Sequence, residues 1–437
     1  MSQLLNGQFM IKGLAIAVTT LMVGTAHAAK TEQQQIQELR QEVEALKSLI
    51  QQQQQVQQQQ QNQIAQVQQA KPAAPVSALS SLKSKSGADI SIYGSIRGDA
   101  NYIIKGADND FNSASTSNEE ASDKLRATAK VTRLGLDFNT PVGDNKVGGK
   151  VEVDFASSDN SKSENLRIRH AYLTLNNWLF GQTTSNFLSN HAPEMIDFAT
   201  NIGGGTTRVP QVRYGYKLAP TTQLFVSAEE GNSSAQTLKY DKTKDEDVVS
   251  SSDVTYRAPV LTAKVTQAYA EGKGSASARA LVEHYKAESG DDKTGWGAAV
   301  GTNYQVAEPL KVSADVSYVK GNSNYLYGSN SAFYVNADNG DIEQNEAFGV
   351  QVGATYKFSP QLRSTLAYGA LFADDGTDYA RINDDANEKV QQAWINFIYS
   401  PVKPVDLGIE YINGERKNFH GQKFSDDRVG FMARYSF

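Results

Sequence analysis

Residues 310–320, with the sequence LKVSADVSYVK, alternate apolar and polar side chains along their whole length. A period of two places the apolar side chains on one face of a β-strand and the polar ones on the other. The same alternation recurs at 147–155, 348–358 and 429–437. We therefore predict an all-β domain over residues 89–437.

The alternation alone also fits a soluble β-sandwich with one face in water. Two features favour a transmembrane barrel instead. The segments are about ten residues long, which is the length that a tilted strand needs to cross a bilayer, and Tyr and Phe gather near strand ends, as in interfacial girdles. Because every backbone group in lipid needs an internal partner, such a sheet must close. A water-filled interior also explains the mean hydropathy of −0.48.

Turns and loops divide this domain into strands. Seven short turns are predicted, at 140–145, 176–177, 218–220, 258–259, 307–309, 358–360 and 400–404. Eight long polar connections lie near 105–123, 157–164, 185–207, 232–247, 272–294, 322–346, 374–388 and 417–426. This pattern predicts a 16-stranded antiparallel transmembrane β-barrel.

Three segments depart from the simple pattern. Residues 277–288 could form a strand, but a seventeenth strand would reverse the order of turns and loops that follow. We therefore expect this segment inside the fifth long connection, with a short helix as the candidate structure. The alternation also slips near 131–133 and near 170–171, which predicts β-bulges there.

The N-terminal part has a different composition. A basic residue, an apolar stretch at 13–24 and a small-x-small site predict a secretory signal peptide over residues 1–28. Residues 30–70 are rich in Gln, yet apolar residues keep two heptad positions, which favours an α-helical coiled coil over a disordered tether. Two prolines then end the helix, so residues 71–88 are predicted as a linker. We expect the barrel in the outer membrane and the coiled coil in the periplasm.

Composition excludes several classes of function. The chain has no Cys, so disulfides, thiolate catalysis and Cys-ligated zinc are excluded. Its five His lack metal-site spacing, and the sequence has no nucleotide-binding or nucleophile-elbow motif. We expect no cofactor, no metal and no enzymatic activity. The net charge of −6 argues against nucleic-acid binding.

The third long connection, residues 185–207, is the candidate constriction loop. It contains Glu194, Asp197 and a glycine run at 203–205. Apolar side chains at Met195, Ile196 and Phe198 would anchor it. A 16-stranded barrel is wide enough for an aqueous channel, so we predict that this loop folds inward and narrows the lumen.

Arginine is frequent at predicted inward-facing positions of the neighbouring strands. These residues are Arg97, Arg133, Arg167, Arg169, Arg208 and Arg213. A constriction lined by them and opposed by Glu194 and Asp197 would attract anions and repel cations. The alternative is that individual arginines form structural ion pairs with Glu152, Asp154 or Asp137.

Several motifs resemble those of a known family. They are RIRHAY at 167–172, GQTTSNF at 181–187, the Pro193, Glu194, Asp197 and Phe198 set, and RVPQVRY at 208–214. Together with the order of signal, Gln-rich heptads, linker and barrel, they resemble the DcaP-like outer-membrane porins over essentially the full chain. The resemblance implies a trimeric channel with a periplasmic coiled coil. It also implies a preference for dicarboxylates, which the arginine cluster fits independently.

The sequence therefore predicts an outer-membrane porin, a passive diffusion channel that prefers small anions. The resemblance implies that dicarboxylates are among these anions. The alternative is a structural tether whose coiled coil binds peptidoglycan or a periplasmic partner. The expected partners are outer-membrane lipid, lipopolysaccharide, small anionic solutes and two further copies of the chain. The acidic loops at 105–123 and 374–388 form either a solvated surface or a site where divalent cations bridge to lipopolysaccharide phosphates.

Overall fold

The computed structural model describes residues 82–85, 87–156, 165–205, 207–241, 246–252, 254–336 and 339–437. The predicted signal peptide, the predicted coiled coil and the linker before residue 82 lie outside the described residues. Among the described residues, no helix has the length and apolarity needed to cross a membrane.

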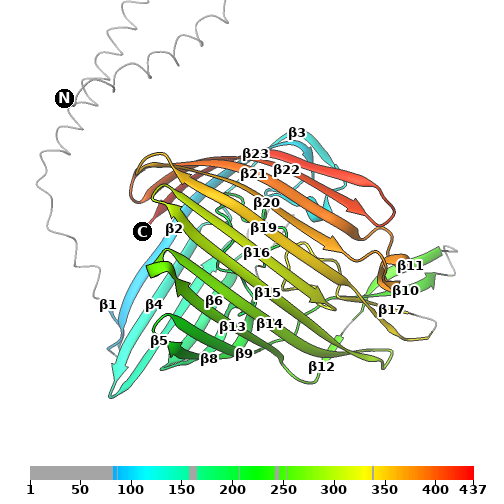
Figure 1. Cartoon of the computed structure of the whole chain (residues 1–437), viewed down its shortest axis with the longest axis horizontal. Helices are drawn as coiled ribbons and strands as arrows, with labels where there is room; N and C mark the ends of the chain where they lie inside the picture. The colour runs from blue at the N-terminus through cyan, green and yellow to red at the C-terminus, as the bar shows by residue number, and fades with distance from the viewer. Residues whose placement is uncertain are drawn as a thin grey trace, which may run out of the picture. The chain divides into compact units, whose positions relative to one another are not determined.

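Sixteen antiparallel barrel strands are formed within the described residues, and each pairs with its neighbours (Figure 1). They are β2 (Asp89–Gly106), β3 with β4 (Ala121–Thr128, Arg133–Val142), β5 (Asn145–Asp154), β6 (Arg167–Leu175), β7 (Trp178–Thr184), β8 (Arg208–Ala219), β9 (Thr222–Glu229), β12 with β13 (Val254–Tyr256, Val260–Tyr269), β14 (Gly274–Ala287), β15 (Asp292–Ala307), β16 (Leu310–Lys320), β19 (Glu346–Lys357), β20 (Leu362–Ala373), β21 (Asn387–Val402), β22 (Val405–Asn418) and β23 (Lys423–Ser436). Strand β23 pairs with β2, which closes the barrel. The predicted strand number is confirmed.

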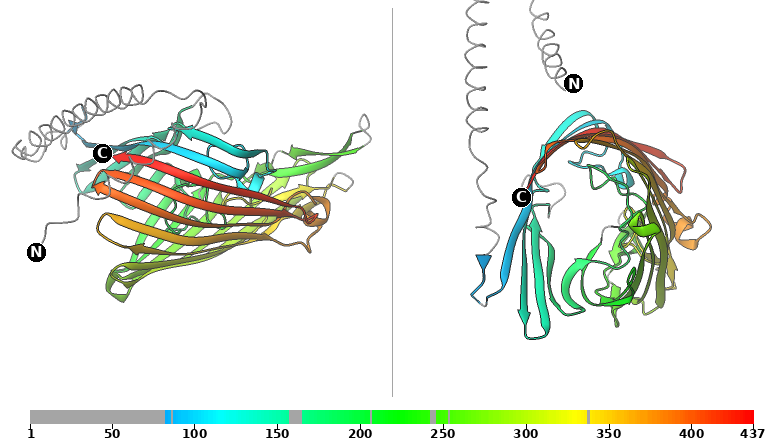
Figure 2. Two further views of the ribbon diagram at one scale, coloured as in Figure 1. Left: turned by 90° about the horizontal axis from the view of Figure 1, so that it is seen from above. Right: turned by 60° about the vertical axis from the view of Figure 1, so that its left-hand side comes forward.

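Side chains alternate between the two faces of the wall. On β22, for example, Ile409 is 43% exposed on the outer face, whereas the neighbouring Glu410 is 1% exposed on the inner face. The outer face is apolar and suits lipid, and the inner face carries most of the charges. Figure 2 shows that loop segments occupy the interior of the barrel.

Two strand assignments from the sequence are wrong, and together they leave the number of strands unchanged. The predicted turn at 258–259 is only a break between β12 and β13, both of which pair with β14. Pro259 has no N–H to donate to the sheet, so pairing stops there without the chain reversing. The chain reverses instead at Ala270–Gly272 (η2), where Ala270, Glu271 and Gly272 have φ of 50°, 55° and 86°.

The segment 277–288 is the other error. It belongs to the 14-residue strand β14, which alternates buried and exposed positions and pairs with β13 and β15 on either side. Its helix-forming residues are overridden by these two neighbouring strands. One strand was thus missed, and another was wrongly placed before residue 258, so the total stayed at sixteen.

Bulges occur close to both phase slips. The chain breaks between β3 and β4, where Thr132 Oγ1 and the backbone of Arg97 exchange hydrogen bonds of 3.1 and 3.2 Å. Between β5 and β6, Glu152 pairs with His170 and Val153 with Ile168, so Arg169 is the extra residue. A bulge re-aims side chains locally, and here it allows both Arg167 and Arg169 to reach β5.

A second, four-stranded sheet is built from loops. It contains β10 (Ala235–Asp241), β11 (Glu246–Ser252), β17 (Phe333–Val335) and β18 (Ile342–Gln344), with β10 parallel to β17. A short strand β1 (Leu82–Lys83) pairs with the start of β2. The described helices are short: η1 (Ala114–Thr116), η2 and α2 (Asp378–Ile382).

Candidate functional site

The loop at residues 185–207, here called the inner loop, lies against the inner wall of the barrel. It leaves the wall after β7 and first contacts β9, where Asn186 Nδ2 donates to Ser227 Oγ at 2.7 Å, and then β14 and β16. Ser189 Oγ donates to Asp315 at 2.5 Å, and the His191 ring contacts Ser275 Oγ at 2.8 Å. Arg279 Nη1 donates to the carbonyl oxygen of Phe187 at 3.0 Å.

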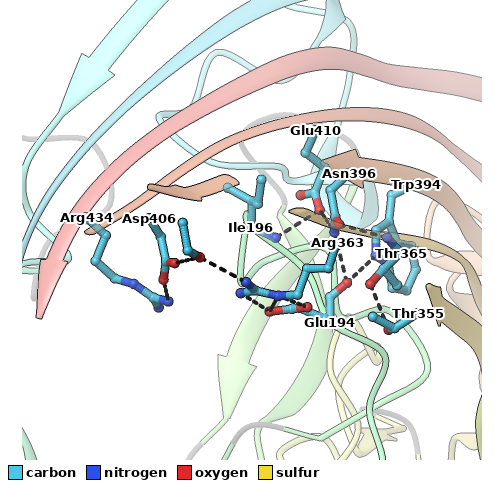
Figure 3. Close-up of polar contacts among 11 residues, drawn as sticks. Glu194, Ile196, Thr355, Arg363, Thr365, Trp394, Asn396, Asp406, Glu410 and Arg434 are labelled. Carbon is cyan, nitrogen blue, oxygen red and sulfur yellow. Dashed lines mark hydrogen bonds and ion pairs between the residues drawn. The ribbon is translucent and has the colours of Figure 1, made fainter. Parts of the chain in front are cut away.

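The tip of the inner loop is held by β20, β21 and β22 (Figure 3), and Arg97 of β2 donates to the carbonyl oxygen of Ile196 at 2.7 Å. Both oxygens of Glu410 accept backbone N–H groups, from Ile196 and Asp197, at 2.9 Å each. Trp394 Nε1 donates to the carbonyl oxygen of Glu194 at 3.0 Å. Because buried backbone groups need partners, this carboxylate and indole fix the loop at depth within the barrel.

The side chain of Glu194 pairs with Arg363 rather than with any arginine of the predicted cluster. Arg363 Nε and Nη2 contact the carboxylate at 2.9 and 2.8 Å. Arg363 continues through Ser400 to Asp406, which pairs with Arg434 (Figure 3). The sequence analysis did not include Arg363 or Arg434 among the site residues, although both occupy inward-facing positions of long strands, Arg363 shortly after the predicted turn at 358–360.

Asp197 does not oppose the predicted arginines by ion pairing either. Its carboxylate accepts the backbone N–H groups of Asn112 at 2.7 Å and Ala199 at 2.9 Å. Burial raises the pKa of Asp197 above its ordinary value. The residue therefore joins the inner loop to residues 107–120, here called the first loop.

The first loop also folds inward, which the sequence analysis did not predict. The η1 turn within it lies against β21, β22 and β23. Asp426 accepts the N–H of Ser113 at 2.7 Å, and Arg428 donates to the carbonyl oxygens of Ala107 and Asn109. Asp426 and Arg428 are fully buried and paired at 2.7 Å.

The acidic side chains of the first loop have basic partners. Asp108 pairs with Lys124, and this hydrogen bond lowers the pKa of Asp108. Asp110 pairs with Arg126 and Lys130 at 2.7 and 2.8 Å. Among the described residues, no group of three or more His, Cys, Asp or Glu is placed to hold a metal ion.

Three of the six predicted arginines are engaged by carboxylates. Arg97 pairs with Asp99 at 2.6 Å, and Arg167 pairs with Asp154 at 2.7 Å. Arg169 bridges Glu152 and Asp154, each at 2.7 Å. For these three residues the alternative interpretation, structural ion pairing, describes the geometry.

The other three arginines have no carboxylate within 4 Å among the described residues. Arg133 begins β4 and Arg208 begins β8, and each lies within electrostatic range of Arg169. Arg208 Nε is buried without a hydrogen-bond partner in the described part of the chain. Arg213 donates only to neutral oxygens, those of Gln211 and Thr184. Lys264 on β13, which the sequence analysis missed, lies within electrostatic range of Arg213.

These four basic residues, Arg133, Arg208, Arg213 and Lys264, lie on strands to which the described residues of the inner loop make no hydrogen bond. This part of the barrel wall is here called the open wall. The loop bonds to β9, β14, β16 and β19–β22, and to Arg97 of β2. Among the described residues, no hydrogen bond or ion pair joins it to β4, β5 or β6. The lumen therefore has one side covered by the inner loop and another lined by basic groups.

Comparison with known proteins identifies the class. The family model for the DcaP outer membrane protein matches residues 22–437. The chain belongs to the DcaP outer membrane protein family. The crystal structure of the outer membrane channel DcaP of Acinetobacter baumannii shares 66% sequence identity with it, with a TM-score of 0.76, over 82% of this chain and 100% of that chain.

Other solved structures share the barrel at low identity. OmpT of Vibrio cholerae is 13% identical with a TM-score of 0.53, over 82% of this chain and 99% of that chain. The anion-selective porin from Comamonas acidovorans is 13% identical with a TM-score of 0.50, over 80% and 100%. These two likenesses concern the fold alone. Comparison with the curated proteins gives no match.

Family membership and the closed barrel together establish this chain as an outer-membrane channel of the porin class. A channel of this class is not an enzyme. The charged groups that line its interior decide which solutes such a channel favours.

Proposed function

We propose that this DcaP-family channel conducts small anions by passive diffusion and prefers dicarboxylates. One observation carries the proposal: Arg133, Arg208 and Arg213 face the lumen without a carboxylate partner. Arginine stays charged at any physiological pH and matches a carboxylate with its planar fork. Uncompensated arginines on a narrow wall attract anions and repel cations.

The paired arginines support the same wall. Arg169 is buried between Glu152 and Asp154, and it lies within electrostatic range of both Arg133 and Arg208. Three guanidinium groups close together with two carboxylates leave a net positive charge at this level of the lumen. A solute with two carboxylates can contact two separate cations, whereas a monocarboxylate can contact only one.

The barrel wall also supports a homotrimer. Strands β7 and β9 contain 7 and 8 residues, whereas β15 and β21 contain 16 each. A tilted strand needs about 9–11 residues to cross a bilayer, so β7 and β9 are too short to face lipid alone, although β8 between them contains 12 residues; this part of the exterior is here called the low wall. Trp178 and Phe180 of β7 are exposed on this part of the exterior. In a threefold assembly, neighbouring copies cover it.

A charge placed on this low wall tests the trimer. Phe180→Lys is expected to lower the assembly from three copies to one, because it buries an unpaired ammonium in the interface. Native mass spectrometry of the protein in detergent measures the stoichiometry. Phe397→Lys, on the tall wall of β21, is the matched control and keeps the wild-type assembly; equal stoichiometry in all three proteins would contradict the interface.

The remaining parts of the proposal rest on the sequence. The signal peptide at 1–28 directs export, and the coiled coil at 30–70 lies in the periplasm. Lipid and lipopolysaccharide surround the barrel.

Solute uptake into liposomes tests the selectivity. Proteoliposomes that contain the full chain are expected to swell fastest in succinate, more slowly in butyrate, more slowly again in the uncharged succinamide, and slowest in the dication putrescine. These four solutes have similar lengths, so charge is the main variable. Swelling in putrescine that equals or exceeds swelling in succinate would contradict the proposal.

A further inference from the structure

A cavity of about 370 Å³ lies between the first loop, the inner loop and the outer ends of the strands near β3 and β6. Its lining includes Phe111, Asn112, Lys130, Arg167, Phe198 and Tyr327. The volume falls within the range of about 300–1,000 Å³ that small-molecule sites occupy. The cavity is separate from the Glu194–Arg363 pair, and it shares only Arg167 with the predicted cluster.

Phe198 gives this cavity an unusual apolar surface. The sequence analysis expected Phe198 to anchor the inner loop together with Met195 and Ile196. Met195 and Ile196 do pack on buried wall clusters, but Phe198 remains 38% exposed. Every other exposed large hydrophobic side chain among the described residues lies on a strand, in a turn, or at residue 166 beside β6, so Phe198 alone is exposed from a loop inside the barrel.

A second ring extends this surface. The ring centroids of Phe111 and Phe198 are 4.7 Å apart with the planes inclined at 49°. Phe111 is held in place by a small apolar cluster with Val131, Ala156 and Ala199. Phe198 therefore lines the cavity with part of its ring exposed, beside a second ring that is fixed in place. Aromatic faces of this kind favour contact with another flat ring.

The cavity offers one accessible cationic donor. Arg167 uses Nε and Nη2 on Asp154, at 2.9 and 2.7 Å, which leaves Nη1 without a partner among the described residues. Its side chain is 36% exposed. Lys130, in contrast, is bound to Asp110 at 2.8 Å and is only 9% exposed.

A buried amide adds a neutral donor. Asn112 is 1% exposed, and its Nδ2 has no hydrogen-bond partner within the part of the chain that the structure describes. Its Oδ1 is already used by the N–H of Ala114 and by Gln392. A buried donor without a partner costs free energy that an acceptor oxygen recovers.

We propose that this cavity is a binding site for aromatic monocarboxylates on their way through the channel. The ring lies against Phe198 and Phe111, and the carboxylate accepts hydrogen bonds from Arg167 Nη1 and Asn112 Nδ2. A second carboxylate on the ring would find no free cation here and would meet Asp110. This site rests on the proposed anion preference, but it selects for a ring and a single charge rather than for two charges.

Block of the ionic current tests the site. Sodium benzoate is added to the full-length protein in a planar bilayer, and the concentration that halves the KCl current is measured. Wild type is expected to respond to lower concentrations of benzoate than of acetate or of the uncharged benzamide. Phe198→Ala is expected to raise the half-blocking concentration of benzoate roughly five-fold, because a ring contact is lost, and to leave that of acetate unchanged.

Further variants separate the two contacts. Arg167→Gln is expected to make benzoate no better than benzamide. Phe198→Leu keeps an apolar side chain but lacks a flat ring, so it is also expected to weaken the block by benzoate. This variant replaces Phe198→Ala in the test if the alanine variant folds poorly. Phe397→Ala, on the barrel exterior at β21 and outside the proposed trimer interface, is the matched control and should behave as wild type.

The inference and the proposed function fail in different ways. Equal benzoate block in wild type, Phe198→Ala and Phe198→Leu would overturn the site, even in a channel that prefers anions. A channel with no anion preference in a salt gradient would overturn the proposed function, even if Phe198→Ala weakened benzoate block.

Discussion

At the scale of single residues, the six predicted arginines fall into two groups that the sequence does not distinguish. Arg97, Arg167 and Arg169 are neutralised by carboxylates on the same or the adjacent strand. Arg133, Arg208 and Arg213 have no such partner within 4 Å among the described residues. The first group stabilises the wall, although Arg167 keeps Nη1 without a partner among the described residues, and the second group provides most of the charge that a solute meets.

Stability measurements distinguish these two groups. Arg169→Ala is expected to destabilise the barrel by about 3–5 kcal/mol, because it leaves Glu152 and Asp154 less compensated in a buried position. Arg133→Gln and Arg208→Gln are expected to leave the free energy of unfolding unchanged or slightly raised, because each lies near Arg169 and repels it. Urea unfolding of the detergent-solubilised protein measures all three. Equal losses would mean that Arg133 and Arg208 also have structural roles.

His191 makes the inner loop sensitive to acid. Burial lowers the pKa of His191; the nearby carboxylate of Asp315 opposes this shift, and the cations Arg279 and Lys264 act in the same direction as burial. The imidazole is therefore neutral in the folded protein, while in the unfolded chain it has its ordinary pKa near 6.5. As the pH falls below about 6.5, the unfolded chain takes up a proton on this imidazole and the folded protein does not. The free energy of unfolding therefore decreases with falling pH, until the pH reaches the lower pKa that His191 has in the folded protein.

The His191→Gln variant tests this dependence. Gln can still contact Ser275 and Ser277, which bind the ring in the wild type, but it does not titrate. Between pH 7.5 and pH 5, the midpoint of thermal unfolding is expected to fall further in wild type than in His191→Gln. The same fall in both proteins would show that other groups cause the acid sensitivity.

At the scale of elements, the inner loop and the first loop form one unit inside the barrel. Asp197 of the inner loop binds the backbone of Asn112 in the first loop, and β22 and β23 hold both loops through Glu410 and Arg428. The inner loop also approaches the wall closely at its glycine run, where backbone meets backbone.

Gly203 is the tightest point of this approach. Its φ is +80°, and a Cβ there would lie 2.5 Å from the carbonyl oxygens of both Ala370 and Val350. Gly203→Ala is expected to displace the inner loop from β19 and β20, to destabilise the barrel by roughly 1–3 kcal/mol and to change the single-channel conductance. Gly421→Ala is the control, because Gly421 has a similar φ of +89° with open space around it.

The comparison of these two variants isolates the close contact from backbone strain. Gly421→Ala is expected to lose a smaller amount of stability and to keep the wild-type conductance. If both variants behave alike, the loop does not press on the wall at Gly203.

The barrel itself could be predicted from sequence because one physical rule repeats along the chain. The alternation of β16 and β22 is set by lipid on one side and water on the other, so each strand signals its own existence. Ion pairs with Glu152 and Asp154 are the alternative that the sequence offers, but which arginines form them could not be predicted, since Arg169 reaches both carboxylates only because of a bulge between β5 and β6. Likewise, the fold of the first loop depends on Asp426 and Arg428, about 300 residues away in the chain.

At the scale of the whole molecule, the inner loop and the cationic wall divide the lumen between them. Segments far apart in sequence contact one another inside the lumen, as Glu194 of the inner loop and Arg363 of β20 do. The acidic residues of the inner loop are engaged elsewhere, Glu194 by Arg363 of β20 and Asp197 by backbone N–H groups, so they do not cancel the free arginines on the open wall. The account therefore makes a prediction about the channel as a whole, namely the sign of its ion preference.

The zero-current potential across a planar bilayer in a KCl gradient tests this sign most directly. For the wild-type channel we expect the polarity of chloride preference, and for the double variant Arg133→Gln with Arg208→Gln we expect a potential much closer to zero. A wild-type potential with the polarity of potassium preference, or a double variant with the wild-type potential, would contradict the role of the open wall.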